Sequence, residues 1–365
     1  MLFAQAVKKA VSMWIEAAAL PDAPPSLKVF LTGVGPWMSA MYFSYLCPQE
    51  GWNPNPPCSE EQLFEAIKFY DPHICGPVIK KLWYFDPSPW GNTAPAVLRY
   101  GSFEAHDLWN QKTLAYYQEL DLGTSKDYAT ELFEVSGMCQ LGCAFSIYIG
   151  QPADAAALLN SIGFTWDKNG LENFNTWFSA VSAAVPFFVA DVEAVFNRLI
   201  IFLSSPDGTI DEAEVNNSIP SPAAIAEMEQ GSIWTRVGWF YDITSFGANA
   251  FLKLGRDDDA YELARLTVAP EQKTLKKSTL VSCHSILGQV AAKRGNMEEA
   301  DGHFAHALEE AKLSSLPMLE VLAARDWKQH ALEPAGRDCN PAESIIDMAC
   351  TNMNKSREQI KRVLA

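Results

Sequence analysis

The sequence predicts an all-α protein, and two observations support this prediction. No run of alternating apolar and polar residues is bounded by an Asn-Gly or Asp-Gly turn, so the usual signature of β-hairpins is missing. Apolar residues instead recur every three or four positions over long segments, which is the spacing of one face of an α-helix. Proline-rich segments at 21–25, 48–57, 87–95 and 204–222 separate these stretches and are the expected loops.

Composition and charge limit the class of protein. The 365 residues are 48% apolar, which suits a folded chain with a large core and argues against disorder. The formal net charge is −16, and so acidic a surface repels phosphate backbones. Nucleic acid is therefore not an expected partner. A solvated acidic face explains the charge most simply, and it also favours basic partners.

The cysteines and the uncharged stretches bear on the compartment. The eight cysteines are scattered and contain no Cys-X-X-Cys pair, which predicts buried reduced thiols and a reducing, cytoplasmic location. Residues 1–20 are amphipathic and make a poor secretory signal, and import into an organelle is kept as an alternative. Uncharged stretches at 29–49, 135–153 and 173–190 are interrupted by proline and polar residues, so buried core helices are expected. Contact of 29–49 with a membrane surface is kept as an alternative.

Residues 279–311 carry the clearest pattern, a pair of amphipathic helices. Gly295-Asn296 ends the first helix, because glycine tolerates the left-handed conformation that a cap needs. Two helices joined by so tight a turn pack antiparallel. The apolar positions of the two faces are Leu280, Cys283, Leu287 and Ala291, then Met297, Ala300, Phe304, Ala307, Leu308 and Ala311.

This unit resembles the tetratricopeptide repeat in the order and spacing of Leu287, Gly288, Gly295, Ala300, Phe304 and Ala307. Weaker copies contain Ala248, Phe251, Gly255, Ala260 and Ala264, and then Cys143, Gly150, Ala155, Leu159 and Ile162. Gly255 and Gly295 are 40 residues apart, longer than the family's repeat of about 34. The resemblance implies antiparallel helix pairs that form a right-handed α-solenoid.

Three regions follow from this pattern. Residues 1–130 are expected to be an aromatic-rich helical region, with one helix over 98–120. Residues 131–335 are expected to hold the repeats. Residues 336–365 are expected to be capping helices, because Asn340-Pro341 starts a helix well and Ser356 with Gln359 forms a capping box.

By the same resemblance, the first helix of each pair lines a binding groove. The predicted groove residues are Gln140, Ser245, Asn249, Leu252, Ser285 and Gln289. These side chains are mostly small or neutral-polar, which suits hydrogen bonds to a peptide backbone. Ser245 and Ser285 stand where a receptor for chaperone tails would need lysine. The prediction is a non-catalytic scaffold for a protein or peptide partner, unless the N-terminal region itself fills the groove.

No catalytic residue, metal or cofactor is predicted. The chain lacks the phosphate-loop, GxGxxG, GxSxG, HExxH and kinase motifs. Boundary or packing roles explain His284, His303 and His306, and Cys139 with Cys143, more simply than metal binding. Residues 205–214 share part of a calcium-loop pattern but have Leu203 in place of the first ligand, so a turn before a helix is expected.

An alternative function places a ligand in the N-terminal half. In this hypothesis an enzyme or small-molecule binder has an aromatic pocket lined by Trp83, Trp90, Tyr100 and Trp109, near His73 and His106. It predicts an enclosed apolar cavity with convergent polar groups, whereas the scaffold predicts an open polar groove.

Overall fold

The fold is taken from a computed structural model of the chain. It describes residues 94–119, 142–161, 190–231, 243–269 and 277–365, together with positions 16, 20–22, 60–61, 64, 68, 164 and 166. Every regular element in these residues is helical, so the all-α prediction is confirmed for them. None of the described helices is both long and apolar enough to cross a bilayer. The chain divides into two compact units, Met1–Leu141 and Gly142–Ala365.

In the first unit the described helices are α6 (Ala94–Tyr100) and α7 (Phe103–Glu119), which pack against each other. The helix predicted over 98–120 is therefore two helices. Gly101 separates them with a φ of 64°, and its N–H donates to the carbonyl of Val97 over 2.8 Å. Glycine adopts this left-handed conformation without the steric cost of a Cβ.

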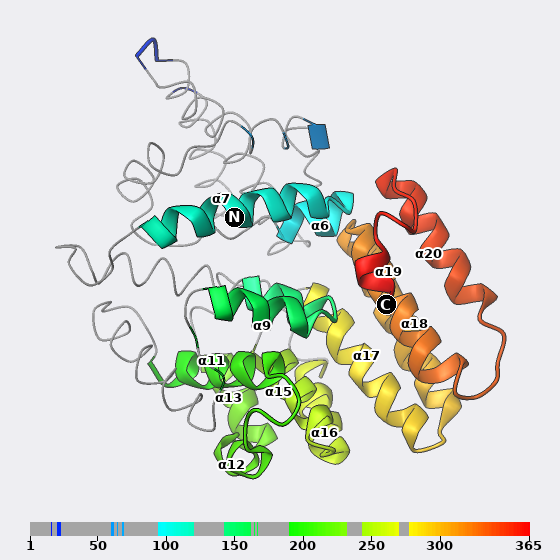
Figure 1. The fold of residues 1–365 in the computed structure, drawn as a ribbon. Coiled ribbons are helices and arrows are strands. Elements are labelled where there is room, and N and C mark those ends of the chain that lie inside the picture. The colour runs from blue at the N-terminus through cyan, green and yellow to red at the C-terminus, as the bar shows by residue number, and fades with distance from the viewer. Residues whose placement is uncertain are drawn as a thin grey trace. The chain divides into compact units, whose positions relative to one another are not determined.

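The second unit contains a short helical segment at 142–148 and a series of helices (Figure 1). These are α9 (Pro152–Ser161), α11 (Ala190–Ser204), α12 (Glu212–Ser218), α13 (Pro222–Gly231), α15 (Ile243–Lys253), α16 (Asp257–Thr267), α17 (Lys277–Lys293), α18 (Met297–Ser314), α19 (Pro317–Trp327), the π-helical turn η3 (Lys328–Leu332), α20 (Asn340–Met353) and α21 (Lys361–Leu364). From α15 to α20 the helices pack in chain order, while α11 packs on α9 and α15, and α13 on α15 and α16.

One turn design recurs four times among the described residues of this unit, at Gly150, Gly255, Gly295 and Gly336, each with φ between 63° and 80°. Each glycine N–H donates to the carbonyl three residues earlier over 2.9–3.1 Å. The N–H of the next residue donates to the carbonyl five residues before it over 2.7–2.9 Å. This pair of bonds closes the end of a helix and turns the chain back. The first three turns define three helical hairpins: the first hairpin (142–161), the second hairpin (α15–α16) and the third hairpin (α17–α18).

Glycines also permit the close approach of the two helices in each hairpin. A Cβ added at Gly288 would lie 2.7 Å from the ring of Phe304, and one at Gly142 would lie 2.5 Å from the side chain of Leu158. In the second hairpin the close approach falls on Gly247, one residue before the alanine predicted for that place. Lys277 and Glu310 form an ion pair at the far end of the third hairpin, so its two helices run antiparallel as predicted.

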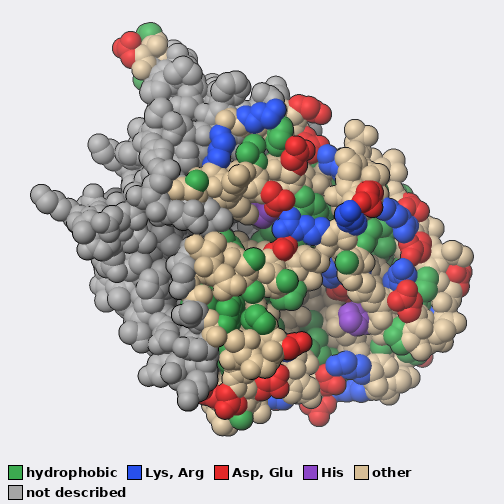
Figure 2. Space-filling view, in the orientation of Figure 1, with side chains coloured by type: hydrophobic (Ala, Val, Ile, Leu, Met, Phe, Trp, Pro, Cys, Tyr) green, Lys and Arg blue, Asp and Glu red, His purple; other side chains and the backbone are tan. Residues whose placement is uncertain are grey.

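Arginines at the turns connect neighbouring elements. Arg294 pairs with Asp258 of α16, and its guanidinium lies 4.6 Å from the ring centre of Tyr261. Arg337 pairs with Asp301 of α18 over 2.8 Å. On the face shown in Figure 2, acidic and basic side chains are accordingly intermingled.

The C-terminal segment contacts the first hairpin. Arg325 of α19 donates to the carbonyls of Ile149 and Val363 over 2.8 and 3.0 Å. Arg362 of α21 pairs with Asp154 of α9 over 2.6 Å. These bonds therefore connect the first hairpin of the second unit to its C-terminal helices.

Predictions for the C-terminal helices are partly confirmed. The helix predicted from Asn340-Pro341 is α20. Ser356 and Gln359 form the expected reciprocal bonds, Ser356 N–H to Gln359 Oε1 at 2.8 Å and Gln359 N–H to Ser356 Oγ at 3.4 Å. Residues 357–360 nevertheless form a turn, and the last helix begins only at Lys361.

Candidate functional site

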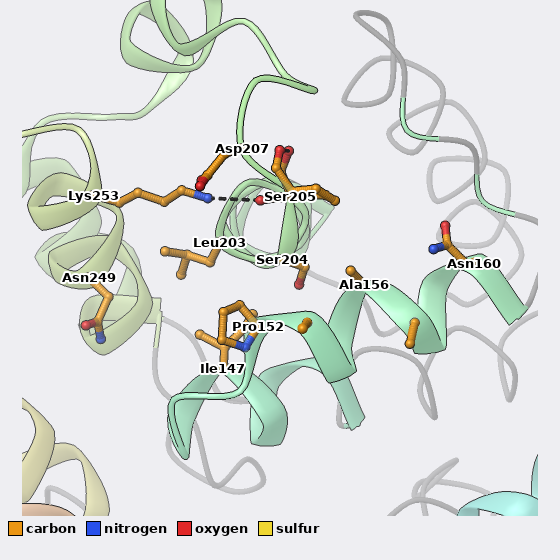
Figure 3. Close-up of a pocket in the computed structure, with 13 residues that line it drawn as sticks. Ile147, Pro152, Ala156, Asn160, Leu203, Ser204, Ser205, Asp207, Asn249 and Lys253 are labelled. Atoms are coloured by element: carbon orange, nitrogen blue, oxygen red, sulfur yellow. Dashed lines mark hydrogen bonds between the residues drawn. The ribbon is translucent and has the colours of Figure 1, made fainter. Parts of the chain in front are cut away.

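A surface cavity of about 640 Å³ lies in the second unit (Figure 3). Its walls come from α9, from the end of α11 with the turn that follows, and from α15. A volume of this size is within the range of roughly 300–1,000 Å³ that is usual for ligand sites. These segments are distant in sequence, so packing alone brings them together.

One wall of the cavity is apolar. Pro152, Ala153, Ala156 and Ala157 follow one another along the start of α9, and all four line the cavity. Ile147 and Leu203 extend this wall. Small side chains at helical spacing leave a shallow surface without a bulky projection, which can accept an aliphatic chain.

The opposite end is polar and is organised by Lys253. Its ammonium donates to the carbonyls of Phe202 and Ser205 over 3.0 and 3.2 Å, at the end of α11. Figure 3 shows the bond to Ser205. The last carbonyls of a helix have no partner within that helix, and cations are stabilised there. Burial lowers the pKa of Lys253, while the charges of Asp207 and Glu212 raise it.

Two further polar groups share this end. Asn249 lies one helical turn before Lys253 on α15, and its side-chain amide donates to the carbonyl of Ser245 over 2.9 Å. Asp207 is exposed at the cavity and forms no ion pair or hydrogen bond with another described residue. The cavity thus contains an exposed carboxylate and a side-chain amide beside an apolar wall.

The segment that carries Asp207 is a turn before a helix, as predicted. Thr209 Oγ1 donates to the carbonyl of Pro206 over 2.6 Å, and Gly208 has a φ of 76°. The Asp211 carboxylate accepts from the N–H of Ala213 over 2.8 Å and caps α12. That carboxylate has the ordinary role of an N-cap.

The six predicted groove residues lie in different environments. Asn249 lines the cavity. Leu252 on α15 and Gln289 on α17 are partly exposed. Ser245 and Ser285 are each only 3% exposed, so they offer a partner almost no surface. Gln140 lies outside the described residues, and the role of the set as a groove stays a prediction.

Burial of the two serines has different local consequences. Ser245 Oγ lies 3.1 Å from Ser282 Oγ, which joins α15 to α17. Ser285 Oγ is buried without a hydrogen-bond partner. Sequence reasoning missed Lys253, and it considered Asp207 only as part of the calcium-loop pattern. The spacing of Lys253, four residues after Asn249 on the same helix, could have indicated the first of these.

A histidine cluster joins the two helices of the third hairpin. His284 Nδ1 lies 3.4 Å from His303 Nδ1, and the ring centres of His284 and His306 are 5.2 Å apart. Burial, then the charges of the other two, lowers the pKa of His284 to about 4. Among the described residues no group of three or more His, Cys, Asp or Glu side chains is placed to hold a metal ion. Cys139 lies outside them, and Cys143 Sγ donates to the carbonyl of Ala155 over 3.6 Å.

Little of the proposed aromatic pocket falls within the described residues. His106 on α7 is 4% exposed and lies 3.0 Å from the side-chain nitrogen of Asn110. Tyr100 is partly exposed. The described residues do not include His73, Trp83, Trp90 or the side chain of Trp109. The aromatic pocket therefore stays a hypothesis.

Comparison with protein families, with curated proteins and with solved structures finds no match to this chain.

Proposed function

We propose that the chain is a non-catalytic interaction scaffold that binds a protein or peptide through tetratricopeptide-like repeats stacked as a right-handed α-solenoid. The recurrence of one hairpin design carries this proposal. Ala155, Ala260 and Ala300 each follow a turn glycine by five residues, and each is 0% exposed. Such repetition of one unit is typical of proteins whose repeats bury a continuous core and offer an extended binding surface.

The compartment belongs to the same proposal. Of the described cysteines, Cys143, Cys283, Cys339 and Cys350 form no disulfide, and all except Cys339 are buried. Buried thiols in a helical-repeat protein support a reducing, cytoplasmic location.

An affinity pull-down with mass spectrometry tests the scaffold function. The wild-type chain is compared with a Leu252→Lys, Gln289→Lys variant, because both side chains are partly exposed and an ammonium there does not have to be buried. Ala305→Lys, on an exposed position of α18, is the matched control. Thermal unfolding of all three proteins verifies that they are folded.

We expect a stable protein partner that the wild type and the control retain and the double variant loses. A partner held equally by all three would place the interaction elsewhere on the chain. The absence of any specific protein partner would contradict the scaffold function itself.

A further inference from the structure

We propose that the cavity between α9, the end of α11 and α15 receives the side chain of an arginine or lysine from a basic peptide. This inference rests on the proposed scaffold function and names the chemistry of the partner. It is argued from the shape of the apolar wall, from the charges at the polar end and from the charge of the neighbouring surface.

The apolar wall matches the stem of a long basic side chain. From Pro152 to Ala157 the helix rises by roughly 8 Å at 1.5 Å per residue. Lysine and arginine lay their three or four methylene groups along apolar surface while the charged head stays in a polar environment. Ala153 and Ala157 are exposed in the cavity wall and leave this surface accessible.

The polar end favours a cation over an anion. The ammonium of Lys253 is engaged with the carbonyls of Phe202, in the last turn of α11, and of Ser205, just after it. The carboxylates of Asp207 and Glu212 both act on Lys253, so these three groups sum to one negative charge. Asp207 forms no ion pair with a described residue and is the natural partner of an incoming guanidinium or ammonium.

The adjoining surface adds to this preference. Residues 205–218 contain Asp207, Asp211, Glu212 and Glu214 and no basic residue. Arg256, whose guanidinium reaches Asn216 in this segment, is itself paired with Asp259 over 2.6 Å. A chain of net charge −16 also steers basic partners toward itself.

Fluorescence anisotropy of labelled peptides tests the proposal. The probe is Ala-Pro-Ala-Arg-Ala-Pro-Ala, and the two comparison peptides carry norleucine or glutamate at the central position. Norleucine keeps an aliphatic stem without charge, and glutamate reverses the charge. The full chain is titrated as wild type, Asp207→Asn, Ala157→Trp and, as a control away from the cavity, Ala305→Trp.

The expected result is that the arginine peptide binds about tenfold more tightly than the norleucine peptide and that glutamate binds weakest. Asp207→Asn should remove the tenfold difference. Ala157→Trp should abolish binding of the arginine peptide by filling the cavity, and Ala305→Trp should leave it unchanged. Higher salt should weaken binding of the arginine peptide more than binding of the norleucine peptide.

Equal affinity for arginine and norleucine, a preference for glutamate, or no saturable binding of the arginine peptide would overturn the proposal. A preference for glutamate would identify Lys253 as the recognising group. Adding Ala157→Trp to the pull-down distinguishes this failure from failure of the scaffold function. If that variant still captures the protein partner, the scaffold function holds and the partner binds outside the cavity.

Discussion

The second and third hairpins share one turn but fill the space between their helices differently. In the third, the ring of Phe304 packs directly on Gly288. In the second, Ala264 occupies the corresponding place, and both Leu263 and Ile225 of α13 lie at Gly247. The third hairpin therefore supplies its own core, whereas the second depends on a neighbouring helix. A helical hairpin can lack a central aromatic residue when another element provides the missing volume.

Removal of the aromatic filler should have the largest effect. Phe304 is 0% exposed, so Phe304→Ala leaves a large cavity against Gly288. We expect it to lower the free energy of unfolding by about 3–5 kcal/mol. Urea denaturation measures this change. A loss below about 1 kcal/mol would mean that the third hairpin does not depend on its own core.

Removal of the borrowed filler should weaken the second hairpin. Ile225 is 0% exposed, and Ile225→Ala is expected to cost about 2–5 kcal/mol. The loss should lie toward the lower end, because Leu263 still covers Gly247. Hydrogen exchange should then rise in α15–α16 more than in α17–α18. Equal increases in both hairpins would contradict the dependence on α13.

Substitutions at the turn glycines should change the free energy of unfolding less than these core substitutions do. Gly295 has a φ of 78° and open space around its Cα, so Gly295→Ala meets a backbone cost and no clash. That cost is about 1–2 kcal/mol. Gly302 is helical and equally open, and Gly302→Ala should instead stabilise by up to about 1 kcal/mol. Thermal unfolding of the pair distinguishes the left-handed turn from a general effect of alanine.

Local signals explain which parts of this architecture could be predicted. The turn at Gly295 and the small residue facing Phe304 lie within a few residues of one another, so the third hairpin was predicted well. The burial of Ser245 and Ser285 was not predicted, because it depends on elements distant in sequence. The cavity has the same origin: α9 and α15 are separated by about 90 residues, and no local spacing relates Ala157 to Lys253.

Acidic pH should destabilise the third hairpin more than the second, since only the third contains histidine. His284, His303 and His306 lie together between α17 and α18, with Glu299 near His303 and Glu309 near His306. From α16, Tyr261 donates its hydroxyl to Glu299 over 2.6 Å. Burial lowers the pKa of both His284 and His303.

A lowered pKa in the folded state means that, between the two pKa values, the unfolded chain binds a proton at this histidine and the folded chain does not. The stabilising effect of neutral His284 is therefore complete above pH 6.5 and is lost as the pH falls toward about 4. We expect the melting temperature of the wild type to fall more steeply over this range than that of His284→Gln, with exchange rising in α17–α18 before α15–α16. Parallel pH profiles for the two proteins would show that the cluster does not couple protonation to the stability of the third hairpin.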